Sequence, residues 1–364
     1  GSDVAEDRLN KFLSIRRKDI HFSPRLQYLL ARGIIDNYHH LYDREKHRLP
    51  TGLVQMVVQE FNASIGSTDL GPELQKVTLT DWCLGGITLS SWQLEAANKV
   101  LTAERGILKM ATNSGKTEVA AAILKAIPQE RALYLVHRKT LLHQTADRLV
   151  TRLGEQVGRI GDGQTSIQRI TVAMVQSIRW RTRKVRSWLE SIRALIVDET
   201  HHLGARQWLN ICERCTGARI RMGMSGTPLL KDQLRDMRLI GATGPVLYEV
   251  RNQQLVDSGW SAKPSVRMVR YTGTRNNRSW ESAYSLLLAD PEYNKLVIRE
   301  VKRLADQDAR ILVLTNRIAH GILLRDMLAG EDIEARFLSG SDKTAWRAVK
   351  LNQLQKGAIQ VIVA

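Results

Sequence analysis

The sequence predicts an α/β protein with two parallel-sheet domains, preceded by a small α/β accessory domain. From Thr80 onward, short apolar runs alternate with segments of helical length, an order typical of parallel strands joined by crossover helices. The runs are apolar almost throughout, as expected for strands covered by helices on both faces. The 364 residues also exceed what one hydrophobic core usually holds.

The accessory domain is predicted to span residues 1–80. Elements of helical or apolar character are expected at 6–15, 26–35 and 53–61. The stretch 38–49 alternates aromatic and basic side chains, so it either contacts nucleic acid or packs on the neighbouring domain. Residues 62–71 are small and polar and predict a linker.

The two larger domains are predicted at 81–245 and 246–364, joined around 245–262. Strands of the first are expected at 107–110, 132–136, 170–174, 194–197 and 220–224. Strands of the second are expected at 266–271, 311–315, 335–338 and 359–363, with helices at 292–305, 321–328 and 343–354. We expect the two sheets to face one another across a cleft.

Composition indicates an anionic partner. Lys and Arg number 54 against 37 Asp and Glu, which gives a net charge of +17 and favours polyphosphate or nucleic acid over a membrane surface. No apolar run approaches membrane-spanning length. The three cysteines are too few for a disulfide framework and fit a reducing compartment. Cys212 and Cys215 form a lone Cys-x-x-Cys pair on a predicted helix, so we expect structural cysteines and no zinc.

A phosphate-binding loop is predicted after the strand at 107–110. The loop reads Ala111-Thr112-Asn113-Ser114-Gly115-Lys116-Thr117 and leads into a predicted helix at 118–127. Free N–H groups at a helix start attract an anion, Lys116 supplies a charge for the outer phosphates, and the Thr117 hydroxyl is expected to coordinate Mg²⁺. Met110 and Asn113 replace glycines of the strict motif, although Asn tolerates a left-handed backbone.

Two further polar groups follow predicted strands. Asp198 and Glu199 come directly after the strand at 194–197, at the carboxyl end where parallel sheets bind ligands. If this strand neighbours the one that feeds the loop, Asp198 can hold Mg²⁺ and Glu199 can polarise the attacking water. Ser225-Gly226-Thr227 ends the next strand; its hydroxyls either bond the His201 region in one nucleotide state or form an ordinary turn.

With the phosphate-binding loop, the Asp-Glu pair and the Ser-Gly-Thr turn in this order, the chain resembles superfamily 2 helicases and translocases. The resemblance implies two RecA-like domains. Residues 110–117 resemble motif I, 198–201 the DEAH-type motif II, and 225–228 motif III. By this resemblance Lys116, Asp198, Glu199 and His201 are catalytic, Gln93 reads adenine, and the loop residues 112–117 bind the nucleotide. The residues that it assigns to nucleic acid are Arg138, Lys139, Gly161, Thr171, Gln176, Asn316 and Arg317.

Within the superfamily, the resemblance is strongest to phage UvsW-type and XPB-like DNA helicases. The passages that carry it are 41–53, 256–260 and 262–264. It implies an ATP- and Mg²⁺-dependent motor that remodels branched DNA such as forks and junctions, with contacts mainly to phosphates. We further expect a monomer, without a membrane partner, in the cytoplasm of a bacterial or phage-infected cell.

The sequence ends at Val361-Ile362-Val363-Ala364, where the family begins motif V. Motif VI, with its arginine fingers, would follow, so we expect this second domain to be incomplete and this polypeptide to bind ATP but hydrolyse it poorly. Gly1-Ser2 is expected to be a remnant of tag cleavage. The alternatives are an RNA helicase, the motor subunit of a restriction system, or a hydrolysis-silent nucleic-acid clamp that ATP regulates.

Overall fold

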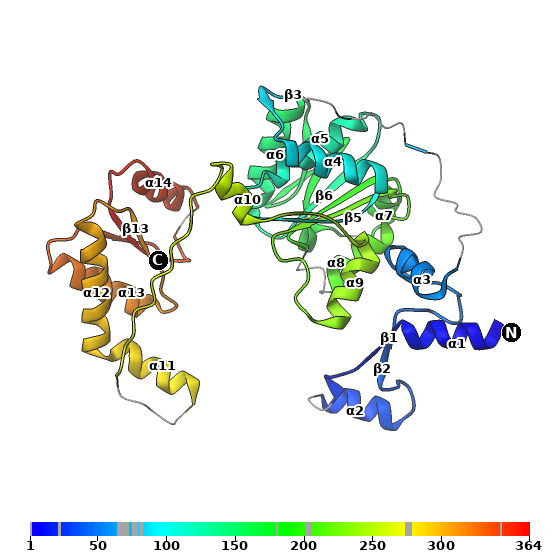
Figure 1. Ribbon diagram of the computed structural model, residues 1–364, viewed down its shortest axis with the longest axis horizontal. Helices are drawn as coiled ribbons and strands as arrows, with labels where there is room; N and C mark the ends of the chain where they lie inside the picture. Colours follow the sequence, from blue (N-terminus) through cyan, green and yellow to red (C-terminus); the bar gives the residue numbers. More distant parts are fainter. Residues whose placement is uncertain are drawn as a thin grey trace. The chain divides into compact units, whose positions relative to one another are not determined.

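The computed structural model describes residues 2–20, 23–63, 73–74, 79, 83–179, 181–200, 206–273, 279–342 and 344–364. It divides into two units, Gly1–Lys263 and Pro264–Ala364 (Figure 1). Among the described residues, no helix is both long and apolar enough to cross a lipid bilayer.

An eight-stranded sheet is the centre of the first unit, in the order β12-β5-β11-β10-β6-β9-β7-β8. All neighbours pair in parallel except β7 and β8. The strands are β5 (Arg105–Met110), β6 (Ala132–Val136), β7 (Val157–Gly161), β8 (Gln164–Ser166), β9 (Ile170–Met174), β10 (Ala194–Asp198), β11 (Ile220–Ser225) and β12 (Val246–Val250). Every residue of β6, β9, β10 and β11 is buried, which confirms the interpretation of these apolar runs as strands covered on both faces.

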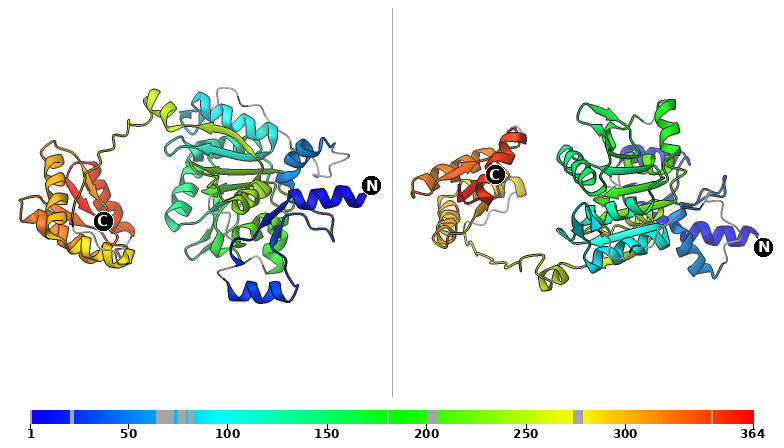
Figure 2. Two further views of the ribbon diagram at one scale, coloured as in Figure 1. Left: turned by 60° about the horizontal axis from the view of Figure 1, so that its bottom comes forward. Right: turned by 90° about the horizontal axis from the view of Figure 1, so that it is seen from above.

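Helices cover both faces of this sheet (Figure 2). One face packs on α4 (Ser91–Ala103), α5 (Lys116–Ala126) and α6 (Lys139–Leu153). The other packs on α7 (Arg183–Glu190), α8 (Arg206–Arg214) and α9 (Gln233–Thr243). Because side chains alternate along a strand, Leu108 joins the first core and Ile107 the second.

The N-terminal residues pack on this core rather than standing apart. They form α1 (Ser2–Phe12), β1 (Ser14–Arg16), α2 (Pro24–Ala31), β2 (Tyr38–His40), η2 (Thr51–Leu53) and α3 (Val54–Phe61), and β3 (Cys83–Leu84) pairs with β4 (Ile87–Thr88) further along. Leu13, Tyr42 and Leu53 form a small core that packs against Ile240 of α9. A Cβ on Gly52 would lie 1.9 Å from the Ile240 carbonyl oxygen, so the contact between η2 and α9 requires glycine.

The second unit contains a three-stranded parallel sheet in the order β13-β15-β14. Its strands are β13 (Ile311–Val313), β14 (Ala335–Phe337) and β15 (Val361–Val363), and its helices are α11 (Trp280–Ala289), α12 (Pro291–Ala305), α13 (Ile318–Ala329) and α14 (Thr344–Gln355). The strand predicted at 266–271 is absent from these described residues. Val266 and Met268 are 82% and 89% exposed, and an apolar run without a partner cannot complete a ladder of hydrogen bonds.

The division between the units also differs from the predicted boundary at 245/246. Strand β12 pairs with the edge strand β5, and α10 (Asn252–Asp257) buries Leu255 in the core of the first unit. Residues 246–263 therefore complete the first sheet, and the second unit begins at Pro264.

Candidate active site

The loop between β5 and α5 has the backbone of an anion-binding turn. Asn113 and Gly115 both adopt left-handed backbone, with φ of 67° and 80°, at positions where glycine or asparagine is favoured. The Ser114 hydroxyl donates to the Ala111 carbonyl at 2.7 Å, and Lys116 Nζ donates to the Met110 carbonyl at 3.2 Å. The N-cap residue of α5 is Gly115, which supplies no side-chain cap to the first turn; the N–H groups at such a helix start are suited to bind an anion.

Gln93 and Trp92 hold the back of this loop. Both the Gln93 amide and the Trp92 indole donate to the Ser114 carbonyl, at 3.1 and 3.3 Å. The Gln93 carbonyl oxygen accepts the backbone N–H of Ser90 at 3.0 Å, so the amide is engaged at both ends. Gln93 therefore positions the loop in this structure, while the reading of adenine stays a prediction. Trp92 was missed; its place in the first turn of α4, directly before Gln93, was the available signal.

The strand order around Asp198 differs from the expectation. Strand β11 lies between β10 and β5, which separates Asp198 from the loop by two strand spacings, about 10 Å. The Lys116 ammonium, which bonds the Met110 carbonyl, is still close enough for its charge to lower the pKa of Asp198. Burial and the neighbouring Glu199 outweigh that effect and raise the pKa of Asp198 to about 6. Lys116 and Asp198 thus converge even though their strands are not neighbours.

The residues around Asp198 fit a magnesium ion. The Tyr134 hydroxyl is fully buried near Thr117 and Asp198, and burial followed by the Asp198 charge raises its pKa well above the usual value. Among the described residues it makes no hydrogen bond of good geometry, although Thr117 and Asp198 both lie close enough to act on its pKa. A buried hydroxyl in this position usually completes its bonding with water or with the shell of an ion. Thr117 and Asp198 offer only oxygen ligands, which Mg²⁺ prefers. The sequence signal for Tyr134 was a polar-tipped side chain in an otherwise apolar strand.

The raised pKa of Asp198 gives a prediction for Asp198→Asn. Because the pKa of Asp198 is higher in the folded than in the unfolded state, ionisation of Asp198 destabilises the folded state. This penalty begins above about pH 4, is complete above about pH 6, and is absent at lower pH. We expect Asp198→Asn to stabilise the metal-free protein at pH 8 by up to about 3 kcal/mol and to lose the stabilisation by Mg²⁺. Thermal unfolding with and without Mg²⁺ and ATP measures both effects.

The matched control is Asp162→Asn. Asp162 is exposed, and hydrogen bonds from Lys139 and His143 lower its pKa, so its replacement should not stabilise the protein. If Asp198→Asn lowered stability at pH 8, or kept the Mg²⁺ effect, the metal assignment would be wrong.

Glu199 is linked to the end of the neighbouring strand β11. The Ser225 hydroxyl donates to Glu199 Oε2 at 3.3 Å and accepts the Thr227 N–H at 3.2 Å. Glu199 has a left-handed backbone with φ of 49°, a costly conformation for a residue other than glycine that is often found at functional sites. A Cβ on Gly226 would meet only the Met110 carbonyl oxygen, at 3.5 Å. The predicted partner of this turn, the His201 region, lies outside the described residues. The catalytic role assigned to His201 therefore stays a prediction.

Several residues assigned to nucleic acid lie at the same carboxyl edge of the sheet. Arg138 and Gln176 are exposed just beyond β6 and β9, and Gln176 donates to the His137 carbonyl at 3.2 Å. Gly161 ends β7. Lys139 pairs with Asp162 at 2.6 Å, so a phosphate would have to displace that carboxylate.

Thr171 does not join this group. It is fully buried near the amino end of β9, and its hydroxyl donates to the Gln168 carbonyl at 3.0 Å. Its assignment to nucleic acid is therefore corrected, because the side chain satisfies a buried turn. Asn316 and Arg317 belong to the second unit, where both are exposed and Arg317 precedes α13 as its N-cap residue.

The cysteine pair packs in the core under α8. Cys212 and Cys215 are buried among apolar side chains, and burial raises the pKa of both thiols. Within the described ranges, no group of three or more His, Cys, Asp or Glu side chains could hold a metal ion.

Comparison with known proteins places this site in a family. Residues 86–230 match the family model described as type III restriction enzyme, res subunit. The chain is 21% identical to the ATP-dependent DNA helicase uvsW of Enterobacteria phage T4, over 98% of this chain and 76% of that protein. It is 28% identical to the DNA 3'-5' translocase XPB2 of Sulfurisphaera tokodaii, over 63% of this chain and 52% of that protein. These similarities support a superfamily 2 helicase.

The fold agrees with this assignment. The crystal structure of T4 UvsW superposes with a TM-score of 0.54 at 18% identity, covering 98% of this chain and 75% of that one. The predicted α/β class with RecA-like parallel sheets is confirmed. This superfamily 2 chain spans about three quarters of UvsW and about half of XPB2.

Proposed function

We propose that this superfamily 2 protein is an ATP-dependent DNA helicase or translocase that remodels branched DNA such as forks and junctions. The observation that carries the proposal is the convergence of Lys116 with Asp198 and of Glu199 with Ser225 at one edge of one sheet. Exposed Arg138 and Gln176 follow strands further along the same edge, which supports a nucleic-acid track beside the nucleotide.

Each residue has a distinct proposed role. Lys116 and the N–H groups of 112–117 bind the phosphates, and Thr117 and Asp198 hold Mg²⁺, which supplies charge neutralisation when bound. Glu199 accepts the proton of the attacking water. The hydrogen bond from Ser225 to Glu199, with Thr227 bonded to Ser225, offers a route by which loss of the outer phosphate changes the turn that follows β11.

The narrower substrate rests on the resemblance of 41–53 and 256–264 to UvsW-type helicases. A restriction-system motor subunit is a second candidate, favoured by the description of the family model that matches 86–230. The experiment that separates them measures ATP turnover with forked DNA, blunt duplex, single-stranded DNA and single-stranded RNA, together with fork reversal on gels. Greatest stimulation by forked DNA supports the proposal; stimulation by RNA alone, or ATP binding without any turnover, would support the RNA helicase or the clamp.

A prediction for the track concerns Arg138→Ala. Removing one phosphate contact should weaken DNA binding about three- to tenfold at low salt and flatten the salt dependence by about one ion, whatever the sequence. Fluorescence anisotropy over a salt series measures both. The control is Arg131→Ala at the amino end of the same strand, where Arg131 donates to Ser191 Oγ at 3.1 Å. Equal losses in the two variants would contradict a track at the carboxyl edge.

A further inference from the structure

A second candidate site lies at the opposite, amino-terminal edge of the large sheet. A cavity of about 1330 Å³ opens there between residues 17–51 and helices α8 and α9. Eight Arg and Lys line it against three Asp and Glu, a steeper excess than the 54 to 37 of the whole chain. None of the described residues assigned to nucleotide or Mg²⁺ lines this cavity, so it is separate from the candidate active site.

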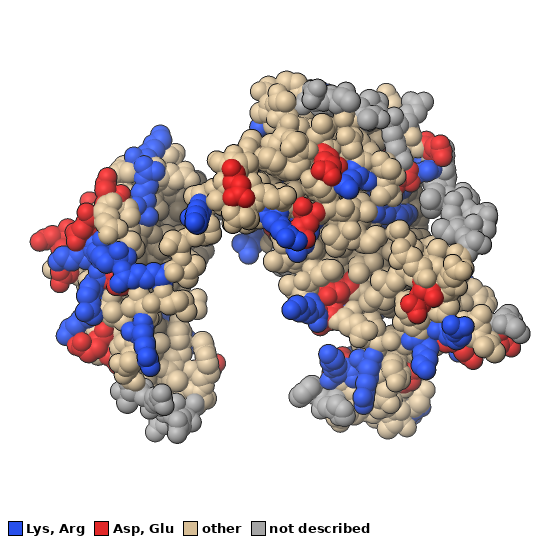
Figure 3. Space-filling view, in the orientation of Figure 1, with Lys and Arg blue, Asp and Glu red and all other residues tan. Residues whose placement is uncertain are grey.

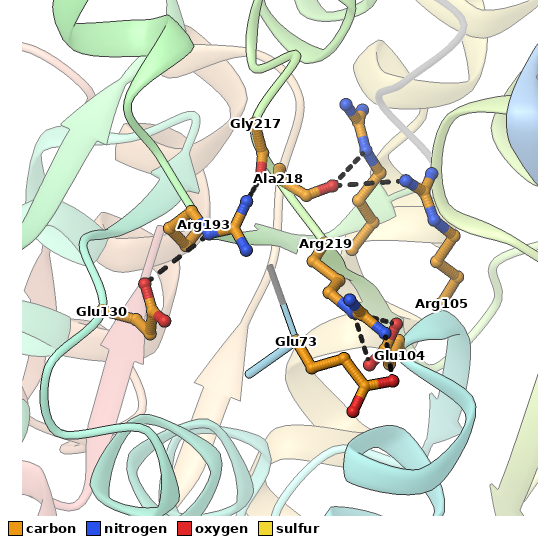
Figure 4. A network of polar contacts seen from close by, with 9 residues as sticks. Glu73, Glu104, Arg105, Glu130, Arg193, Gly217, Ala218 and Arg219 are labelled. Carbon is orange, nitrogen blue, oxygen red and sulfur yellow. Dashed lines mark hydrogen bonds and ion pairs between the residues drawn. The ribbon is translucent and has the colours of Figure 1, made fainter. Parts of the chain in front are cut away.

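The floor of the cavity consists of guanidinium groups bonded to backbone carbonyls. Figure 4 shows Arg105 and Arg193 reaching the turn at Gly217 and Ala218, with distances of 3.3 and 2.9 Å to its carbonyl oxygens. Arg221 is buried and donates to the carbonyls of Cys212, Cys215 and Ala218. Among the described residues, neither Arg105 nor Arg221 has a carboxylate within ion-pair distance; the nearby Glu104, whose charge acts on Arg105, is itself paired with Arg219 at 2.8 Å.

The like charges on this floor repel one another. Burial, and next the nearby Arg221, lower the pKa of Arg105 to about 10. An anion in the cavity would offset the repulsion between these guanidinium groups more fully than Glu104 does, because Glu104 is shared with Arg219.

The walls add cations from three separate elements. Arg17 follows β1, Arg206 begins α8 and Arg238 lies on α9. Arg17 donates to the Tyr38 carbonyl at 2.9 Å, and no carboxylate in the described part of the chain pairs with any of the three. The charges of Arg17 and Arg238 both lower the pKa of His39, after the larger effect of burial, so they approach the same side of the cavity. In Figure 3, several Lys and Arg side chains lie on the lower part of the first unit, below the large sheet.

We propose that this cavity binds the sugar–phosphate backbone of a single nucleic-acid strand, such as one arm of a branched substrate; the choice of polymer rests on the function proposed above. Guanidinium groups on separate elements suit several successive phosphates. The volume exceeds the usual 300–1,000 Å³ or so of small-molecule sites. The described lining has no Phe, Tyr or Trp for stacking, which favours backbone contacts over recognition of bases. A cavity of about 1330 Å³ holds a few nucleotides of one flexible strand, whereas a duplex is too bulky to enter it.

The test compares Arg17→Ala, Arg206→Ala and Arg238→Ala in the whole chain without ATP. Fluorescence anisotropy over a salt series gives the affinity for a fork with a single-stranded arm and for a blunt duplex. Each variant should bind the fork about three- to tenfold more weakly, with a salt slope flatter by about 0.7, and should bind the duplex as before. The matched control is Arg16→Ala: Arg16 is exposed at the end of β1, adjacent to Arg17, but does not line the cavity.

A second measurement locates the strand directly. A photoreactive thymidine in the single-stranded arm should cross-link to peptides from 39–51 or 206–217. Equal weakening for fork and duplex, or a fork that cross-links only elsewhere, overturns the proposal. Tripolyphosphate binding that the same variants abolish, without any cross-link of the fork in these peptides, would assign the cavity to a small anion instead. Because these experiments need no ATP, their failure is distinct from a loss of DNA-stimulated turnover, which concerns the active site alone.

Discussion

Replacing Glu199 with Gln is expected to lower DNA-stimulated ATP turnover by about 10²- to 10⁴-fold, the usual contribution of a general base. The affinity for ATP should change by less than about twofold, because the amide keeps the shape of the carboxylate. Its oxygen can still accept the hydrogen bond that Ser225 donates to Glu199 Oε2 at 3.3 Å. The measurement is turnover at saturating forked DNA, paired with the affinity for a fluorescent ATP analogue.

The matched control for this variant is Glu249→Gln. Glu249 lies on β12, bonds Lys109 at 3.0 Å, and has a pKa lowered mainly by that hydrogen bond. It is a partly exposed carboxylate that the proposed mechanism does not use, so turnover should stay within about twofold. Unchanged turnover in Glu199→Gln would reject Glu199 as the base, whereas equal losses in both variants would indicate a general effect of charge.

The second large effect is expected for Lys116→Ala. Lys116 Nζ donates to the Met110 carbonyl and lies near Asp198, a position from which it can turn to an outer phosphate. Hydrogen bonds to charged groups contribute about 1.5–3 kcal/mol, so ATP affinity should fall by about 10- to 150-fold. Calorimetric titration with a non-hydrolysable ATP analogue and Mg²⁺ measures this loss.

Lys109→Ala is the control for that experiment. Lys109 lies on β5, seven residues before Lys116 in sequence, and its charge is paired with Glu249 at 3.0 Å. Its removal should leave ATP affinity within about twofold. Lys116→Ala also removes the charge that lowers the Asp198 pKa, so its unfolding temperature should be compared at pH 6 and 8 before the loss is attributed to phosphate binding.

Much of the fold and of the candidate active site could be predicted from short stretches of sequence. The order of strand, loop and helix at 105–126 could be predicted from adjacent residues, because a helix start and a left-handed turn depend mainly on the residues that form them. The same holds for Asp198 and Glu199, which follow an apolar strand. Apolar runs such as 132–136 and 170–174 identified central strands because no polar face is tolerated there.

Local patterns failed where a residue's role depends on distant partners. The run at 266–271 resembles a strand but pairs with no strand among the described residues. Thr171 resembles a contact residue but is buried in β9, where its hydroxyl bonds the preceding turn. Trp92 and Tyr134 gave weak signals because their importance comes from the loop and carboxylate that they approach.

The sequence by itself determined most of the short segments that are strands, the loop that is shaped for phosphate, and the resemblance to superfamily 2 helicases. Only the tertiary structure decided that β11 lies between the loop strand and β10, that β12 completes the first sheet, and that Arg17, residues 39–51 and helices α8 and α9 line a basic cavity. The physical reason is that parallel pairing joins segments far apart in the chain. The order of strands, and the charges that meet at their ends, are therefore set by packing between distant segments.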